Sequence, residues 1–307
     1  MALPSTIDQN FVQQYQATLY ALSQQQKSKF VGCVRNESIT GESKAFDRLG
    51  EAEVQEITVR HSETPNNEQP HTRRWVTPTN FDTNAYVDDA DKLKMLINPT
   101  SEYTQNQARA LGRKMDDIII TAALGSAAAG VTASTGTVAF KDEAISINGD
   151  GTVTTLGTLA AVATVDNITL AKIATMLRLF FDEDVDEQIP LYWAISPKDV
   201  QSMLQVQQIT SSDYVAMRPL EAGSIVKFCG FNFFRSTRLT KDAVTSTAWR
   251  TFAWAQDGII WASAKGVTSH IDELPTRRYT TQVYSVMNGG AVRMEGAKVH
   301  ECLNKVA

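Results

Sequence analysis

The sequence has few of the features that are typical of a secreted protein, a membrane protein or a non-specific DNA-binding protein. Its three cysteines are scattered with no paired spacing, which favours a reduced cytosolic origin over a disulfide framework. It shows no basic segment followed by an apolar one, so no signal peptide is expected, and it has no run of about 18 apolar residues that could span a membrane. With 29 Lys and Arg against 34 Asp and Glu, a net charge of −5 and no basic block, strong non-specific DNA binding is not expected.

Catalytic and metal-binding signatures are also missing. The motifs GxxxxGK[ST], GxGxxG and GxSxG do not occur, so nothing indicates a phosphate-binding loop or a nucleophile elbow. His300 and Cys302 form the one close His/Cys pair, and two ligands do not make a zinc site. The acidic run 182–187 lacks the ligand spacing of an EF-hand loop, so we interpret it as a solvated helix end. We expect no catalytic residues, no metal and no cofactor.

One long helix is the clearest element that the sequence does contain. Asn98 can cap it, Pro99 suits its first position, and Gly125 is a natural stop. Its charged residues, Asp116 among them, fall mostly on the side opposite its apolar face. At 1.5 Å per residue the helix would be roughly 37–40 Å long and could connect separate subdomains. Residues at three- and four-residue intervals predict its buried face: Tyr103, Gln107, Leu111, Met115, Ile118, Ile119 and Ala122.

Residues 31–97 have strand character, as in FVGCVR, but few apolar side chains. A hairpin drawn from them could have legs of about 15 residues, near 50 Å each, and a two-stranded hairpin without a core is barely stable in water. It must therefore fold back, stay mobile or lie on another subunit. Its charges suit polar inter-subunit contacts, although a solvated strand surface explains any single charge. The candidates for such contacts are Lys44, Arg48, Arg60, Arg73 and Arg74.

The Gln-rich segment of residues 1–30 carries a narrow apolar stripe that includes Phe11 and Tyr15. Alone it would be a marginal helix, so it needs a surface to lie on. That surface is either its own domain or a neighbouring molecule, and Phe11 and Tyr15 are candidates for the second case.

The remaining residues alternate short strands with helices. Asn148–Gly151 and Asn288–Gly290 have the composition of hairpin turns. A helix is expected after Asp166 or Asn167, a buried strand at residues 191–197, and a short helix from Pro197. This irregular alternation is typical of the α+β class.

The order of these segments resembles that of a tailed-phage major capsid protein with the Hong Kong 97-type fold, particularly in short-tailed phages. Residues 39–53 (ITGESKAFDRLGEAE) resemble the start of that family's extended loop, and residues 98–125 resemble its spine helix. Residues 209–239 resemble an axial-domain segment, and residues 290–303 resemble the closing peripheral-domain strand. The resemblance covers about residues 30–303 and lies in segment order rather than in one motif.

The resemblance implies an α+β fold with an N-terminal arm, an extended β-hairpin loop, a long spine helix in a peripheral domain and a mixed axial domain. The corresponding ranges are residues 1–35 for the arm, 36–90 for the loop, 91–189 for the peripheral domain with its spine helix at 99–125, 190–265 for the axial domain, and 266–307 for the return strands of the peripheral domain.

The implied function is that of a major capsid protein rather than an enzyme. Its copies would assemble as hexamers and pentamers into the icosahedral shell of a virion, in the host bacterial cytoplasm. The shell would enclose double-stranded DNA that it contacts weakly, and it would mature from a procapsid. A separate scaffolding protein and a portal are implied partners, a cement protein is left open, and no membrane is involved. Lys44 lies in the loop without the context of a crosslinking partner, so no covalent crosslink is expected.

Two alternatives remain open. An encapsulin-like bacterial nanocompartment shell protein would share the fold and hold a cargo enzyme, so neighbouring genes would separate it from a viral shell. A metal-dependent or hydrolytic enzyme with a dispersed site is the alternative from another class, and stoichiometric metal with turnover would support it.

Overall fold

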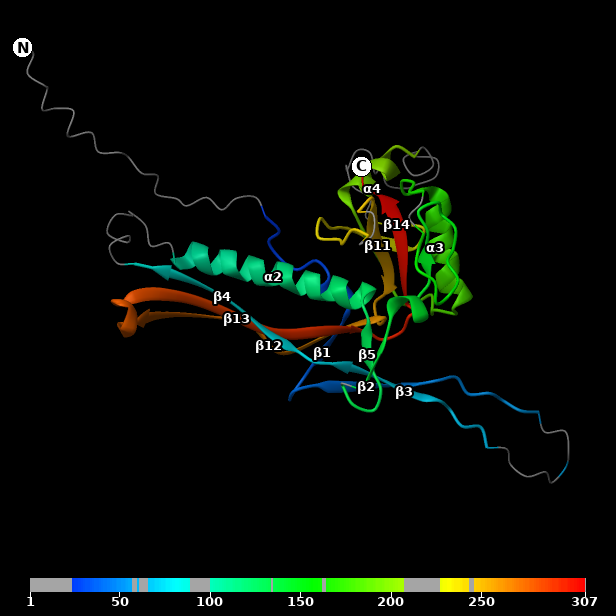
Figure 1. Cartoon of the computed structure of the whole chain (residues 1–307), viewed down its shortest axis with the longest axis horizontal. Helices are drawn as coiled ribbons and strands as arrows, with labels where there is room; N and C mark the ends of the chain where they lie inside the picture. The colour runs from blue at the N-terminus through cyan, green and yellow to red at the C-terminus, as the bar shows by residue number, and fades with distance from the viewer. Residues whose placement is uncertain are drawn as a thin grey trace, which may run out of the picture. The chain divides into compact units, whose positions relative to one another are not determined.

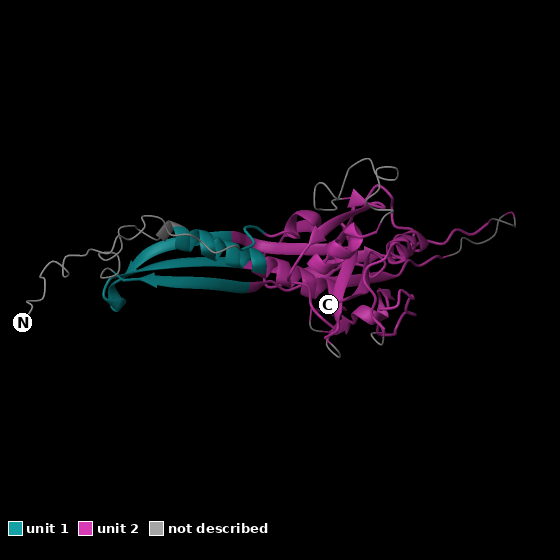
Figure 2. Ribbon diagram, turned by 90° about the horizontal axis from the view of Figure 1, so that it is seen from above, with its two compact units in different colours: residues 1–27, 80–113, 267–287 teal, residues 28–79, 114–266, 288–307 magenta. Residues whose placement is uncertain are grey.

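The computed structural model describes residues 24–56, 60, 66–88, 100–133, 135–161, 164–206, 227–242 and 246–306. The predictions for Phe11, Tyr15 and the start of the 209–239 segment lie outside these residues. The chain forms two compact units, coloured separately in Figure 2. Unit 1 comprises Met1–Lys27, Asn80–Arg113 and Val267–Met287, and unit 2 comprises Ser28–Thr79, Lys114–Gly266 and Asn288–Ala307. The five-part division expected from the sequence stays a prediction.

Unit 2 contains a six-stranded sheet in the order β7-β14-β11-β8-β10-β9. Figure 1 labels two of its strands, β11 and β14, which pair with each other. The predicted buried strand at 191–197 is confirmed, because β8 lies inside the sheet, parallel to β10 and antiparallel to β11. The strands are β7 (Ser146–Ile147), β8 (Leu191–Ile195), β9 (Lys227–Phe228), β10 (Phe231–Arg235), β11 (Ala248–Ala255) and β14 (Val299–Lys305).

Two helices complete this part of unit 2. Helix α3 (Leu170–Asp182) begins at Thr169, whose side chain accepts a hydrogen bond from the Lys172 backbone N–H, close to the predicted start. Helix α4 (Pro197–Leu204) begins at the proline as predicted, with a capping box between Ser196 and Asp199. Apolar side chains of α3 pack with Trp193 and Phe231 of the sheet in one hydrophobic cluster, so the helix and the sheet share a core.

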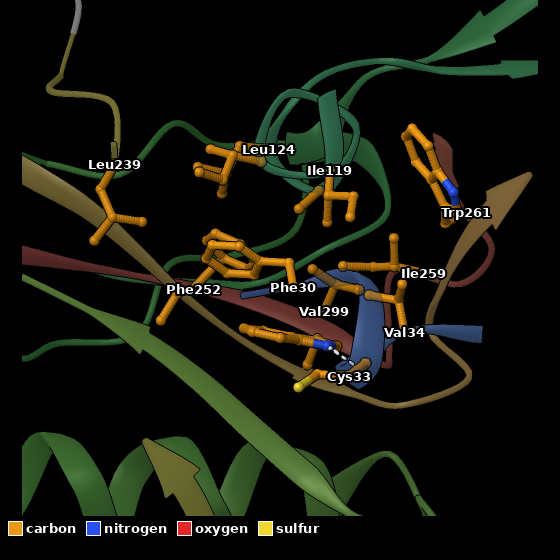
Figure 3. Packing of buried hydrophobic residues seen from close by; sticks show 14 of the residues in the cluster. Phe30, Cys33, Val34, Ile119, Leu124, Leu239, Phe252, Ile259, Trp261 and Val299 are labelled. Carbon is orange, nitrogen blue, oxygen red and sulfur yellow. Dashed lines mark hydrogen bonds between the residues drawn. The ribbon is translucent and has the colours of Figure 1, made fainter. Parts of the chain in front are cut away.

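A second cluster in unit 2 surrounds the last turns of helix α2 (Thr100–Leu124) (Figure 3). Phe30 and Ile119 are fully buried there, and Trp254 Nε1 donates a hydrogen bond of 2.9 Å to the Cys33 carbonyl. The expectation that Asp116 lies on the exposed side is wrong. Its carboxylate is completely buried and accepts hydrogen bonds from Ser28 Oγ and from the Lys29 and Phe30 backbone N–H groups. Residues 28–30, which precede the 3-10 helix Val31–Cys33, thus supply its partners.

A four-stranded sheet of unit 2, in the order β2-β3-β5-β6, holds the base of the predicted hairpin. Strands β2 (Lys44–Leu49) and β3 (His71–Val76) pair antiparallel from Lys44 opposite Val76 to Leu49 opposite His71. Gly50 N then donates to Pro70 O, and the ladder ends. Beyond it, residues 51–56 and 66–70 are outside any strand and almost all exposed. Strands β5 (Ala127–Ala129) and β6 (Gly136–Val138) extend the other side of the sheet.

A third sheet has the order β1-β12-β13-β4, made of β1 (Arg35–Ser38), β12 (Ile259–Leu274), β13 (Thr280–Arg293) and β4 (Thr79–Val87). Residues of both units occur in each of β12, β13, β4 and α2. Within unit 1, Gln107 of α2 donates to the Val283 carbonyl over 3.0 Å and accepts from Ser285 Oγ over 2.8 Å. The polar member of the predicted helix face is therefore buried and bonded to the sheet.

Two predictions about local structure are wrong. Asn288–Gly290 does not turn, because β13 runs straight through it. A Cβ on Gly289 would lie 2.4 Å from the Trp261 ring, and one on Gly290 would lie 2.9 Å from the Thr77 carbonyl, so these glycines admit close neighbours. The strand expected in FVGCVR is instead a 3-10 helix, Val31–Cys33, that precedes β1. In the described part of the chain, 3-10 helices also occur at Phe140–Asp142 and Pro275–Arg277.

The spine helix agrees with its prediction at its C-terminal end, whereas the predicted cap at Asn98 and Pro99 lies outside the described residues. It ends at Leu124, and Gly125 N donates to Thr121 O over 2.8 Å. Gln107, Leu111 and Ile119 of the predicted face are buried, whereas Tyr103, Met115, Ile118 and Ala122 are half-buried. A face chosen from spacing alone was therefore correct for most of its length.

Candidate functional site

The base of the hairpin in unit 2 is organised around one carboxylate, that of Glu143. Arg48 of β2 donates to its Oε1 over 2.9 Å, and Arg74 of β3 donates to the same oxygen. Arg293 of β13 approaches Oε2 at 3.4 Å. Glu143 follows the 3-10 helix Phe140–Asp142, so three strands and one loop meet at a single buried ion cluster. We call these four residues the ionic base.

Arg293 also joins the ionic base to the end of the long helix. Its guanidinium is fully buried and donates to the carbonyls of Ala123 (2.9 Å) and Gly125 (2.7 Å). These carbonyls at a helix C-terminus lack partners within the helix and carry partial negative charge, so a cation there is favourable. The hairpin base and the end of α2 are therefore held by the same side chain.

The electrostatics of the ionic base keep Glu143 ionised. Burial by itself would raise the pKa of its carboxyl group, but the neighbouring Arg74 and Arg293 outweigh burial and lower that pKa. Arg48 adds a hydrogen bond in the same direction. Removing the carboxylate would leave three buried or half-buried guanidinium groups facing one another, which is costly in a low-dielectric interior.

The predicted contact residues are used in different ways. Arg74 is 3% exposed and Arg48 is half-buried, and both are committed to Glu143 within the chain. Lys44 pairs with Glu37 at 3.2 Å, and Arg73 pairs with Asp47. Arg60 is exposed at the described part of the hairpin tip. A role of these side chains in contacts between copies stays a prediction, as it does for Phe11 and Tyr15 outside the described residues.

Sequence reasoning missed Glu143 and Arg293. Both lie far along the chain from the hairpin. They are 150 residues apart in the sequence and form an ion pair with each other. A single glutamate between short strands and an arginine in the closing strand carry no local signal of pairing. The one available hint was that Arg293 is the one charged residue of the segment 280–293, where a buried unpaired charge would be expensive.

A cavity of about 830 Å³ opens beside the ionic base. Its lining is mixed in charge, with Arg48, Arg73 and Arg74 against Asp47, Asp142 and Glu143. Because most of these groups already pair with one another, the cavity has no strong preference for an ion of either sign. The pairing within the chain therefore indicates a structural base rather than a binding pocket.

The outer part of the hairpin contrasts with its base. Leu49 is 59% exposed and Val54 is 96% exposed. Among the described residues of 51–56, the contacts are confined to Asn67 Nδ2 donating to the Glu53 carbonyl and Gln55 Nε2 donating to Asn67 Oδ1. A segment with apolar side chains in water and no ladder lacks the interactions that stabilise a strand.

The described ranges contain no group of three or more His, Cys, Asp or Glu side chains placed to hold a metal ion. Cys33, Cys229 and Cys302 are free thiols. None of the helices that the structure describes has both the length and the hydrophobicity required to cross a bilayer.

Comparison with solved structures identifies the architecture. The chain is similar to the capsid of cyanophage Pam1, with a TM-score of 0.73, 14% sequence identity and 100% of both chains covered. It is also similar to the capsid of cyanophage P-SCSP1u, with a TM-score of 0.72, 15% identity, and 98% of this chain and 95% of that chain covered. For Mycobacterium phage Che8 the TM-score is 0.69 at 14% identity, with 95% and 97% covered. The predicted α+β phage-capsid fold is confirmed.

Family comparison extends this result from fold to role. A search of curated protein sequences gives no match. A family model described as phage capsid protein matches residues 7–306, which is nearly the whole chain. The chain therefore belongs to the phage capsid protein family and is a structural subunit of a viral shell.

Proposed function

We propose that copies of this chain assemble as hexamers and pentamers into an icosahedral shell that encloses double-stranded DNA. Assembly would take place in the host bacterial cytoplasm, with a separate scaffolding protein and a portal, and the chain would carry no catalytic activity. Rotation-related contacts between unlike surfaces close such rings without requiring a tight pairwise interface. The net charge of −5 suits a container that must not bind its DNA strongly.

The observation that carries this proposal is the exposed outer hairpin on a rigid base. The ionic base holds β2 and β3 where the hairpin begins, since Arg48 and Arg74 are both bonded to Glu143. Beyond Gly50 and Pro70 the chain has no ladder and exposes Val54 almost completely. A hairpin segment without a ladder or a core beneath it has little stability of its own, so a neighbouring copy is its natural support.

The test is assembly with and without the outer hairpin. The wild-type chain, expressed together with its genomic neighbours, should give closed particles by electron microscopy. A variant in which residues 52–68 are replaced by Asn-Gly keeps the ladder from Lys44 to Leu49. It should fold, with an unchanged thermal midpoint before assembly, but should give no closed particles.

The control replaces the same residues by a Gly/Ser segment of equal length. It should also give no closed particles, because it preserves the length of the hairpin but not its side chains. Closed particles from both variants would refute the role of the hairpin, and the absence of particles from the wild type would refute the proposed function itself.

A further inference from the structure

A cluster of three polar side chains lies inside the core that α3 shares with the six-stranded sheet. Lys172 of α3, Asp199 of α4 and Asn304 of β14 are each no more than 2% exposed, although these residue types are seldom fully buried. Helix α3 lies beside β14 (Figure 1), and Lys172 and Asn304 are 132 residues apart in the sequence. The fold thus encloses an amine, a carboxyl group and a carboxamide in one place within unit 2.

The amine of Lys172 is held against the carboxamide of Asn304. Its Nζ donates to the carbonyls of Asp166 (3.1 Å) and Leu303 (2.9 Å) and lies 3.4 Å from Asn304 Oδ1. The carboxamide carbon is one bond from that oxygen. Gly151 packs against the lysine stem, since a Cβ there would lie 3.6 Å from Lys172 Cγ. The amine is therefore positioned beside a group that it can attack.

The carboxamide of Asn304 is fixed from several sides. Its Nδ2 donates to Thr251 Oγ1 over 3.2 Å, and its Oδ1 lies 3.5 Å from the Cys302 thiol. Asp199 also forms a hydrogen bond with the Asn304 side chain. Held in this way, the carboxamide keeps one orientation toward Lys172.

Asp199 can accept the proton that a lysine must lose before it acts as a nucleophile. Its Oδ2 accepts hydrogen bonds from the Ser196 backbone N–H (2.8 Å) and from Ser196 Oγ (2.7 Å). Burial nevertheless raises the pKa of the Asp199 carboxyl group, even with the positive charge of Lys172 nearby. A carboxyl group that holds a proton more readily than an exposed aspartate, and that bonds the reacting amide, is suited to general acid–base chemistry.

We propose that Lys172 and Asn304 react to form an isopeptide bond inside the folded subunit, with Asp199 transferring the protons. Asp199 takes a proton from the Lys172 ammonium, and the neutral Nζ attacks Cγ of Asn304. Asp199 then protonates the developing oxyanion. The new Nζ–Cγ bond remains, the Cγ–Nδ2 bond breaks, and the amide nitrogen leaves as ammonia. In sum, an ammonium and a carboxamide give a secondary amide and an ammonium ion, and Asp199 is unchanged.

The surroundings of the cluster favour this reaction over hydrolysis. Met176, Trp193 and Cys302 of the shared core are almost completely buried, so water is kept from the reacting carbon. The reaction occurs once in each chain and joins two parts of one subunit. It therefore differs from catalytic turnover and from any contact between copies, and it does not involve Lys44. A link that spans 132 residues would strongly restrict the unfolded chain.

The intact mass of the wild-type chain, measured under denaturing conditions, tests the proposal. One isopeptide bond makes the chain lighter by one ammonia, about 17 Da. Trypsin should then give a branched peptide that contains Lys172 and Asn304, with no cleavage after Lys172. The unmodified mass would overturn the proposal, and so would a loss of ammonia that maps to other residues. The wild-type mass is decisive even where a variant does not fold.

Two matched variants test the role of Asp199. Asp199→Asn keeps the size of the side chain and an oxygen for Ser196, but it cannot take the lysine proton, so the bonded fraction should fall about tenfold. The control Asp182→Asn changes an exposed carboxylate at the end of α3 and should form the bond as the wild type does. Circular dichroism checks that each variant is folded. An undiminished bonded fraction in Asp199→Asn would overturn the role assigned to Asp199.

Discussion

The six-stranded sheet and the hairpin both belong to unit 2, but they are stabilised in different ways. Trp193 in the sheet is fully buried, with strands on both sides and α3 packed against the same core. Val54 in the hairpin is 96% exposed, and the ladder that should support it stops at Gly50. The comparison shows that one subunit can combine a self-sufficient core with a segment that is completed only by a neighbour.

The ionic base marks the boundary between the internally stabilised part of unit 2 and the exposed outer hairpin. On one side of it the chain satisfies its polar groups internally, as Glu143 does with three arginines. On the other side the polar and apolar groups of residues 51–56 face water. A stability measurement should therefore respond to changes in the sheet and at the base, and an assembly measurement should respond to changes in the outer hairpin.

The largest effect on stability is expected in the sheet. Trp193→Ala should lower the free energy of unfolding by about 3–5 kcal/mol, because it opens a cavity between Phe231 and Phe233, whose ring centroids lie 5.3 and 5.7 Å from that of Trp193. Urea denaturation of the unassembled chain measures it. A loss below about 1 kcal/mol would mean that the sheet is not the self-sufficient region.

The next largest effect is expected at the ionic base. Glu143→Gln should cost about 3 kcal/mol, since Arg48, Arg74 and Arg293 would then face one another without a carboxylate. The control is Asp47→Asn, which removes the partner of Arg73 from an exposed pair and should leave the denaturation midpoint unchanged. Equal effects of the two substitutions would show that the base is not buried as described.

Acid should weaken the sheet through His300. Burial lowers the pKa of this residue from 6.5 to about 4, and its ring lies edge-on to Phe180. The unfolded chain binds the proton more readily between these values, so this contribution is present above pH 6.5 and is lost as the pH falls to about 4, up to about 3 kcal/mol in all.

Urea midpoints measured between pH 7 and 4 check this expectation. The variant His300→Met removes the titrating group while filling a similar volume, so its stability should fall less steeply with acid than that of the wild type. Parallel pH profiles for the two chains would show that His300 does not titrate in this window.

The smallest effect on stability is expected in the outer hairpin. Val54→Ser should change the free energy of unfolding by no more than about 0.5 kcal/mol, because the side chain touches little in the free subunit. The same substitution should reduce the yield of closed particles seen by electron microscopy. An unchanged particle yield would show that Val54 has no role in assembly. A large loss of stability would show that its side chain makes stabilising contacts in the free subunit.

Elements with a local pattern were predictable. The spine helix, strand β8 and the helix starting at Pro197 all follow from periodicity, continuous hydrophobicity or capping residues within a few positions. The exposed character of the hairpin also followed, because a scarcity of apolar residues is visible without knowing where the chain folds. The order of these elements was sufficient to suggest the phage-capsid fold.

Features that depend on distant partners were not predictable. Asp116 is buried because residues 28–30 supply its donors, and Asn288–Gly290 continues a strand because Trp261 and Thr77 pack where side chains would be. Arg48 and Arg74 are candidates for contacts between copies, and within the subunit both pair with Glu143, a partner that sequence spacing did not indicate. The sequence by itself thus determined the local elements and their order. The tertiary structure alone decided which charges are used internally, because pairing energies depend on distances that sequence spacing does not contain.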